Sequence, residues 1–401
     1  MAIADSVVKP VEIEADTSQV PSPAELRREY LLDPDIVYLN HGSFGACPRV
    51  VFDAYQAWQR ELERQPVAFV GRRQEPLLDA ARAYLATYLK AGPDDLSFVV
   101  NATSGLNVIA RSLPLSAGDE ILTTNLEYGA LNLTWDYLCA KAGARYVRQP
   151  IPLPVTTAAE FVDALWEGVT ERTTAIFLSH ITSATALILP VAEVCRRARE
   201  AGILTIIDGA HAPGQLPLDL TAIGVDVYAG NCHKWLSAPK GAAFLYVRPE
   251  QQEWVESLTI SWGWRPGHNF VSRNQQQGTR DPSAFLATST AIDFQTTHDW
   301  PRVRAACHRR LSGLRARLID RFGIAPIHPD IPEWYSQMVT IPLPPIDDGK
   351  QLQRRLLDIH GIEVPVSGHD DRRFVRVSVQ GYTTDEDLAA LERALVLELA
   401  G

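Results

Sequence analysis

Between about residues 29 and 280, short apolar runs alternate with segments that have the spacing of amphipathic helices. Strands that consist of continuous apolar residues are buried on both faces of a sheet, and helices between such strands are typical of parallel crossover connections. The sequence therefore predicts an α/β fold with a mostly parallel sheet. The predicted strands are 96–100, 120–124, 175–179, 203–208, 227–230 and 242–247, and a helix at 191–202 is predicted to end at Gly202.

The pattern changes after about residue 300. A long arginine-rich amphipathic helix is predicted at 303–322, followed by a strand in 336–344, a helix at 349–360, a strand at 374–379 and a last helix that contains Leu388, Leu391 and Leu395. This mixture is typical of a smaller α+β domain. We expect a flexible N-terminal arm at 1–28, a large domain at 29–295 and a small C-terminal domain at 296–401, which suits a chain of 401 residues.

Composition excludes several classes of protein. The formal net charge of −10 argues against a nucleic acid or an anionic membrane as partner. No apolar run is long enough to span a bilayer, and the N-terminal segment has acidic residues and no apolar core, so we do not expect a signal peptide. The five cysteines include no C-x-x-C pair, which favours a reducing cytoplasm and argues against a disulfide framework or a zinc site.

In open α/β sheets, ligands bind outside the carboxyl ends of the strands. Asp208 stands at the end of one predicted strand and His211 follows it. A carboxylate there needs a cation or hydrogen-bond donors, and a protonated pyridine nitrogen supplies both. Two other interpretations stay open: Asp208 caps the next turn, or it shares a metal ion with His211. The metal is disfavoured because no third ligand has a suitable spacing.

Lys234 lies in a weakly charged stretch between two predicted strands. Lysines are seldom buried without a reason, and desolvation lowers the amine pKa as a Schiff-base lysine requires. The alternative is a surface lysine whose stem covers apolar residues. Lys240 is a competitor, but Pro239 and Gly241 flank it and predict a turn.

Two further segments follow predicted strands. In NATSGLN (101–107), Thr103 and Ser104 open a predicted helix whose free N–H groups and dipole suit a phosphate, although such residues are also ordinary helix caps. In the segment 123–135, Tyr128 suits stacking on a flat heteroaromatic ring or work as a general acid, and a buried core tyrosine is the alternative.

The order of these segments resembles that of class V aminotransferase-fold enzymes, and within them that of the isopenicillin N epimerases. The matching motifs extend over nearly the whole chain after residue 28; they include YLNHGSFGACPR, EYGA, DGAHAP, GNCHKWLSAPKG, SWGW, QGTRD, AIDFQ and VRVSVQGYTT. HKWL together with DGAHAP is highly specific. The resemblance implies a fold-type-I transferase dependent on pyridoxal 5′-phosphate (PLP), with a seven-stranded-type sheet in the large domain.

The resemblance also implies roles for individual residues. Lys234 would hold PLP as a Schiff base, Asp208 would pair with the pyridinium nitrogen, and His211 would lie near the ring hydroxyl. The phosphate would be held by Thr103, Ser104, Asn231 and His233, and by Thr279 of a neighbouring subunit in a homodimer. Arg376 would bind the substrate α-carboxylate. Tyr128 would lie near the ring and Asn40 and His41 near the substrate mouth, with Tyr128 or His41 as a second acid.

The implied activity is chemistry at Cα of an amino acid or cysteine conjugate, in secondary metabolism: epimerisation or C–S cleavage by β-elimination. Transamination, decarboxylation-coupled deamination and an inactive scaffold stay as alternatives. Cysteine desulfurases of this fold carry a catalytic cysteine before the carboxylate-binding arginine; the segment 362–378 has none, which argues against persulfide chemistry, and Ser183 stands where those enzymes tend to have Asn. A dehydrogenase would need a G-x-G-x-x-G turn, which this sequence lacks.

Overall fold

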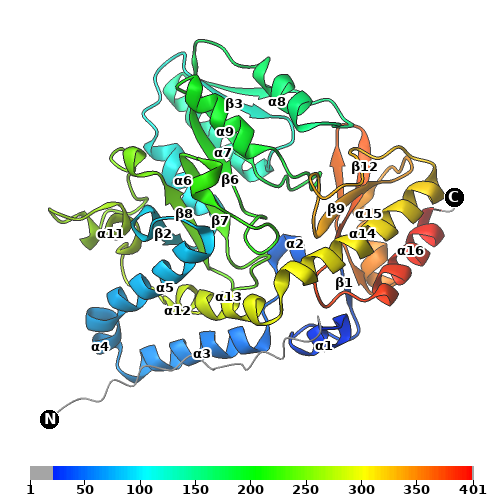
Figure 1. Ribbon diagram of the computed structural model, residues 1–401, viewed down its shortest axis with the longest axis horizontal. Coiled ribbons are helices and arrows are strands. Elements are labelled where there is room, and N and C mark those ends of the chain that lie inside the picture. Colours follow the sequence, from blue (N-terminus) through cyan, green and yellow to red (C-terminus); the bar gives the residue numbers. More distant parts are fainter. Residues whose placement is uncertain (1–20, 400–401) are drawn as a thin grey trace.

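The computed structural model describes residues 21–399, and a seven-stranded sheet forms its centre (Figure 1). The strand order is β2-β8-β7-β6-β5-β3-β4. Within this sheet β8 (Ala243–Val247) is antiparallel to both its neighbours, β2 (Leu96–Val99) and β7 (Val227–Asn231), and the other strands run parallel. The predicted mostly parallel α/β sheet is therefore confirmed.

Six of the seven strands coincide with predicted apolar runs. Besides β2, β7 and β8 these are β3 (Glu120–Thr124), β5 (Thr173–Ser179) and β6 (Leu204–Asp208). The seventh, β4 (Arg145–Gln149), was not predicted. It pairs only with β3 and lies at the sheet edge, so its residues are exposed or half-buried and lack the apolar run that marks the central strands.

Helices cover both faces of the sheet, as the alternation of side chains along each strand requires. On one face, α6 (Ala102–Ser112) and α7 (Gly129–Ala142) pack on residues such as Ile121, Phe177 and Leu245. On the other face, Leu122, Leu178 and their neighbours belong to a larger core with α5 (Gln74–Leu89) and α9 (Val191–Glu200). Gly202 has a φ of 71° just beyond α9, which confirms the predicted helix end.

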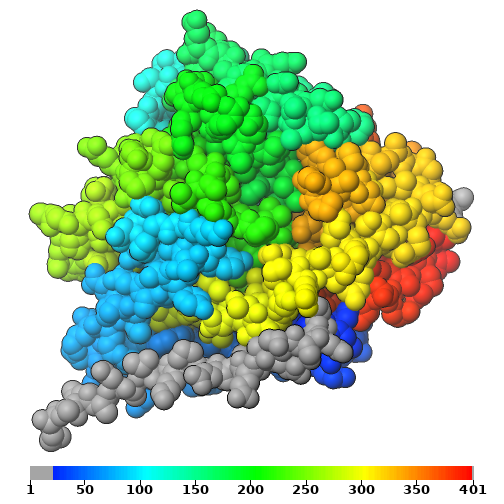
Figure 2. Space-filling model, in the orientation of Figure 1, coloured from blue at the N-terminus to red at the C-terminus, as the bar shows by residue number. Residues whose placement is uncertain are grey.

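The C-terminal residues form a second lobe beside the sheet, coloured orange to red in Figure 2. The 23-residue helix α14 (Trp300–Phe322) leads into it. An antiparallel sheet of order β11-β12-β9 follows, made of β9 (Met338–Pro342), β11 (Val366–His369) and β12 (Arg372–Ser378), together with α15 (Gly349–Asp358) and α16 (Asp385–Leu399). This is the smaller α+β arrangement that the sequence predicts after residue 300.

The N-terminal segment packs against residues from the far end of the chain. Strand β1 (Val37–Tyr38) pairs in parallel with β10 (Ile362–Glu363), and α2 (His41–Phe44) follows it. Most of the predicted arm at 1–28 lies outside the described residues, but Pro23–Arg28 is helix α1, closed at its start by a capping box of Ser22 and Glu25. Within residues 21–399, no helix is long and apolar enough to cross a membrane.

Candidate active site

The carboxyl ends of four neighbouring parallel strands bring polar residues to one edge of the sheet. β6 ends at Asp208 and β7 ends at Asn231. In the strand register Asp208 lies opposite Ala229 on one side and Ser179 on the other. The loop after β3 carries Tyr128. This is the edge where ligands bind in α/β sheets, and the side chains predicted from separate motifs meet there.

Lys234 lies in the loop after β7 and contacts His211. The Lys234 Nζ atom is 3.2 Å from His211 Nε2, and the indole N–H of Trp235 donates to His211 Nδ1 at 3.4 Å. Burial lowers the pKa of His211 well below its usual value, so the imidazole is neutral. Because Nδ1 accepts from the indole, the ring proton belongs on Nε2, which then donates to the Lys234 amine.

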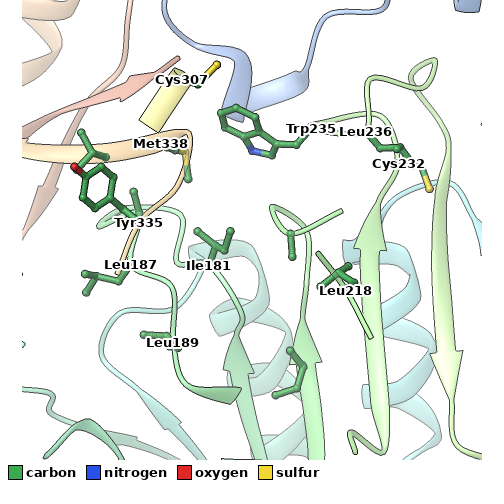
Figure 3. Packing of buried hydrophobic residues seen from close by; sticks show 14 of the residues in the cluster. Ile181, Leu187, Leu189, Leu218, Cys232, Trp235, Leu236, Cys307, Tyr335 and Met338 are labelled. Atoms are coloured by element: carbon green, nitrogen blue, oxygen red, sulfur yellow. The ribbon is translucent and has the colours of Figure 1, made fainter. Parts of the chain in front are cut away.

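That arrangement requires a neutral Lys234 amine to accept the bond. Burial lowers the pKa of Lys234 to about 8, while the charge of Asp208 opposes this shift. A neutral amine is nucleophilic and can form a Schiff base. Figure 3 shows Trp235 beyond the strand ends. Close by, a Cβ on Gly42 would come 2.6 Å from Met338 Sδ and 3.4 Å from the Trp235 ring, so α2 packs tightly against the Lys234 loop.

Asp208 is buried at the end of β6. Burial raises its pKa, whereas the Ala210 N–H, 2.9 Å from Oδ1, and the charge of Lys234 act in the opposite direction. A buried carboxyl with a raised pKa is stabilised in its ionised form by any cation that binds next to it. The structure therefore brings Asp208, His211 and Lys234 into one cluster, as the sequence predicts.

The start of α6 lies beside this cluster, held by two asparagines. Asn101 Oδ1 accepts from the Ser104 N–H at 2.7 Å, and Asn231 Oδ1 accepts from the Ala102 N–H at 2.8 Å. Asn231 thus fixes the helix start and offers only its Nδ2 group to an anion. Thr103 and Ser104 are half-buried in the first turn, where the helix dipole attracts negative charge.

His233 was expected to hold a phosphate. Its Nδ1 atom lies 3.0 Å from the Ala242 carbonyl oxygen, which can only accept, so the proton belongs on Nδ1. Burial lowers the pKa of His233 to about 4. The neutral ring therefore presents a lone pair at Nε2, and it can donate to an anion there only after taking up a second proton, which a bound anion would favour.

His41 is fully buried, and its two ring nitrogens face polar groups of the protein. Nδ1 lies 2.9 Å from the Tyr382 hydroxyl, and Nε2 lies 3.0 Å from the Lys234 carbonyl oxygen. Burial lowers the pKa of His41 to about 3. A buried neutral imidazole against the Lys234 backbone suits the positioning of that loop better than the second-acid role that the sequence suggested, because it has no free nitrogen for substrate.

Arg376 on β12 is also buried and lies beside Asn40. One terminal nitrogen donates to the Ser183 carbonyl oxygen at 2.8 Å, and the other donates to Ser43 Oγ at 2.9 Å. Asn40 Oδ1 lies 3.5 Å from the second nitrogen. The structure thus groups Arg376 with Asn40, as expected, and adds Ser43, which sequence reasoning missed.

Two predicted residues lie at the surface. Tyr128 is 44% exposed in the loop before α7, so it is not the buried core tyrosine of the alternative interpretation. Thr279 is exposed in the loop between α11 (Phe270–Gln275) and α12 (Ser283–Leu286). Among residues 21–399, no hydrogen bond connects Thr279 to the cluster, so the structure does not bring this predicted residue together with the others.

Glu127 was missed by the sequence analysis. Its carboxyl is buried, accepts from the N–H and hydroxyl of Ser179 at 2.8 and 2.6 Å, and accepts from the Thr124 hydroxyl at 2.8 Å. Burial raises the pKa of Glu127 to about 7, and the charge of Asp208 adds to this. These bonds tie the loop that carries Tyr128 to β5. Its position in the loop that follows the buried strand β3 was the available signal.

Comparison with known proteins identifies relatives of the whole chain. The family model described as Aminotransferase class-V matches residues 37–391. The chain is 38% identical over 389 residues to isopenicillin N epimerase of Amycolatopsis lactamdurans, covering 93% of this chain and 97% of that protein. It is 30% identical over 428 residues to putative L-cysteine desulfhydrase 1 of Oryza sativa subsp. japonica, covering 93% and 86%.

The fold also matches solved structures. A cysteine desulfurase from Thermococcus onnurineus superposes with a TM-score of 0.81 at 18% identity, over 96% of this chain and 99% of that one. The fold-type-I arrangement expected from the resemblance is therefore confirmed. Proteins of the matched family and its structural neighbours depend on PLP.

Proposed function

Since this chain belongs to the aminotransferase class-V family, we propose that it is a PLP-dependent enzyme that acts at Cα of an amino acid or a cysteine conjugate. The observation that carries the proposal is the buried amine of Lys234, whose pKa burial lowers to about 8, lying 3.2 Å from His211 and next to the buried Asp208 carboxyl. A reactive amine beside a carboxylate that needs a cation fits a cofactor with an aldehyde and a protonated ring nitrogen.

The residues at the sheet edge fit the parts of this cofactor. Lys234 would bind its aldehyde and Asp208 would face its ring nitrogen. The α6 start with Thr103 and Ser104 would hold the phosphate together with His233. Tyr128, exposed at the same edge, would cover the ring. When bound, the ring withdraws electrons from the bond that breaks at the substrate Cα.

The chain's own groups then position the substrate and move its proton. Arg376 binds the α-carboxylate as a planar donor. Lys234 takes the α-proton on Nζ, which its lowered pKa of about 8 allows near neutral pH. His211 keeps the amine in place through Nε2. Glu127 holds the loop of Tyr128, the candidate for a second acid on the opposite side.

The reaction that follows the loss of the α-proton determines the product. We favour epimerisation or β-elimination with C–S cleavage, in secondary metabolism, because relatives over most of the chain include an isopenicillin N epimerase and putative cysteine desulfhydrases. In the elimination, the Cβ–S bond breaks and its electron pair leaves with sulfur, so no second base at Cα is needed. Transamination and decarboxylation-coupled deamination are the runner-up outcomes.

The test is to incubate the enzyme with L-amino acids and cysteine conjugates in heavy water. Deuterium at Cα with inverted configuration identifies an epimerase. Pyruvate with a released thiol identifies a C–S lyase, and an oxo acid formed only with an added acceptor identifies a transaminase. If no amino acid exchanges its α-hydrogen or is converted, the proposal is wrong.

The cofactor assignment has a separate test. Borohydride reduction of PLP-treated protein followed by peptide mapping should label Lys234. The Lys234→Ala variant should lose that label, and Lys240→Ala, which removes the neighbouring lysine, should keep it. A label on Lys240 in the wild-type protein, or failure of the protein to take up PLP, contradicts the assignment.

We also propose a homodimer in which Thr279 reaches the neighbouring site. The loop before α11 exposes Ile260 and Trp262 at 69% and 66%, a degree of apolar exposure that favours burial against another chain. Mixing inactive Lys234→Ala and Thr279→Ala subunits should restore activity, because each hybrid then contains one intact site. A monomeric protein in sedimentation, or no restoration on mixing, contradicts this arrangement.

A further inference from the structure

Arg376 is a buried cation with neutral partners. Only 7% of the residue is exposed, and burial lowers its pKa to about 10. Among residues 21–399, no carboxylate lies within salt-bridge distance of its guanidinium; its acceptors are Ser183, Ser43 and, at 3.5 Å, Asn40. A buried arginine without a counter-ion strongly favours an anion that can reach it.

The hydrogen bonds of Arg376 show which edge of the guanidinium is available. The first terminal nitrogen donates to the carbonyl oxygen and the hydroxyl of Ser183, at 2.8 and 3.3 Å. The second donates to Ser43 at 2.9 Å. The Nε atom is buried and has no partner within the described part of the chain. A carboxylate that binds Nε and the second terminal nitrogen side by side would share that second nitrogen with Ser43, at 2.9 Å, and with the long 3.5 Å contact to Asn40.

A chain of hydrogen bonds leads from that second nitrogen to a carboxylate. Arg376 donates to Ser43 Oγ, Ser43 Oγ donates to Asn40 Oδ1 at 2.5 Å, and Asn40 Nδ2 donates to Glu363 Oε1 at 2.9 Å. All three bonds point the same way, from the cation to the anion, and bonds arranged in this way strengthen one another. Glu363 fixes the orientation of the Asn40 amide, because a carboxylate accepts only from its NH₂ group.

The backbone keeps Glu363 in this place. It lies on β10, opposite Tyr38 of β1, and its carbonyl oxygen accepts from the Leu39 N–H at 3.0 Å. Asn40 is the next residue along the chain. The side chains of Asn40 and Glu363 are therefore brought together by a two-residue strand pairing between positions far apart in the sequence.

From this geometry we propose that Glu363 is a positioning residue for Arg376, acting through Asn40 and Ser43. It holds the guanidinium so that its Nε edge receives the substrate α-carboxylate. The inference rests on the proposed function, in which Arg376 binds that carboxylate. Glu363 touches neither the cofactor residues nor the substrate, so its loss should weaken the recognition of carboxylate and leave amine reactivity unchanged.

The test compares glycine with methylamine, which differ only in the carboxylate. Binding of each to PLP-loaded enzyme is followed by the change in the cofactor absorbance band. In Glu363→Ala the dissociation constant for glycine should rise by roughly tenfold, the effect expected from losing a hydrogen bond to a charged group, and that for methylamine should not change. Glu363→Gln keeps an acceptor for Asn40 and should stay within about threefold of wild type.

Two further variants keep the outcomes distinct. Ser43→Ala interrupts the same chain, and the double variant Glu363→Ala/Ser43→Ala should bind glycine no more weakly than the weaker single variant, because the two residues act in series. Arg376→Lys tests the proposed function. If Arg376→Lys weakens glycine binding and Glu363→Ala does not, only the positioning role of Glu363 is wrong. If neither variant weakens glycine binding, the proposed role of Arg376 in binding the carboxylate is wrong as well.

A general structural defect would give a different result. If Glu363→Ala weakened glycine and methylamine equally, Glu363 would not act through Arg376 and the inference would be overturned. Thermal unfolding of each PLP-loaded variant shows whether the variant folds. If Glu363→Ala does not fold, Glu363→Gln is compared with Ser43→Ala instead. Equal glycine affinities for these two variants contradict the proposal.

Discussion

At the residue scale, burial sets the charge of the groups that meet at the sheet edge. Lys234 and Asp208 could be predicted because charged residues next to apolar strands are uncommon and need a partner, whereas Arg376 was expected only from the family resemblance. Ser43 and Glu363 could not, since nothing near either residue marks it; only the tertiary structure places them beside Arg376. Sequence reasoning thus selected residues that the structure brings together and missed the residues that contact Arg376.

The pKa of Lys234 gives a prediction on pH. Its amine has a pKa of about 8 in the folded protein, below the ordinary lysine value, so the neutral form is lost as pH falls through 8. The rate of PLP uptake by the cofactor-free protein should therefore rise with pH, reach half of its maximum near pH 8 and level off at higher pH. Stopped-flow absorbance measures this rate. A rate that rises steadily to pH 10, as for free lysine, contradicts the lowered pKa.

His41 provides a second prediction at this scale. His41→Ala removes a buried side chain that contacts the Lys234 carbonyl oxygen and Tyr382, so the free energy of unfolding should fall by about 2–4 kcal/mol. His41→Gln keeps a donor and should retain most of the stability and the pH profile of activity. Urea unfolding and a pH–rate profile measure these effects; loss of one limb of the profile in His41→Gln would indicate an acid–base role instead.

At the scale of elements, the sequence predicted the central strands of the large sheet but not the strand at its edge. The central strands are apolar along their whole length, whereas β4 has a polar sequence because it has only one neighbour. The pairing of β1 with β10 joins two residues from each segment and leaves no pattern in either. Local sequence cannot encode a contact between segments more than three hundred residues apart.

Glycines at element ends give a prediction on how the Lys234 loop is held. Gly45, at the end of α2, has a φ of 73°, and a Cβ there would lie 2.1 Å from the His233 carbonyl oxygen and 2.9 Å from Lys234 Cα. Gly45→Ala should therefore destabilise the protein and weaken PLP retention, because the loop must move. Gly313→Ala within α14 is the control: its Cβ would make only an ordinary contact, 3.5 Å from Arg317 Nη1, and the free energy of unfolding should rise by up to about 1 kcal/mol. Equal PLP affinity in wild type and Gly45→Ala contradicts this account.

At the scale of the whole molecule, one apolar core connects both lobes. It includes Leu26 and Leu39 near the N-terminus, Leu178 in the large sheet, and Leu314 and Leu391 near the C-terminus. The predicted domain boundary at 295 therefore crosses a continuous core, a feature that no local change in sequence texture reveals.

Because the apolar core is continuous, we expect that the large domain at 29–295 cannot fold alone. A fragment of residues 29–295 would expose the surface that Trp300, Leu314 and Val377 cover in the intact protein. We expect the full chain to unfold in a single cooperative transition and the fragment to show none. Circular dichroism against temperature tests this, with the full chain as control, and a cooperative transition in the fragment contradicts it.

The groups of the proposed site come from distant parts of the chain, and this has a consequence for how the enzyme matures. Positions 101–234 supply the groups proposed to bind the cofactor, whereas Glu363 and Arg376 are synthesised much later. Burial lowers the pKa of the Lys234 amine, and the core of the protein extends through both lobes. A nascent chain should therefore acquire its reactive amine only when the C-terminal lobe packs, together with the arginine proposed to recognise the substrate.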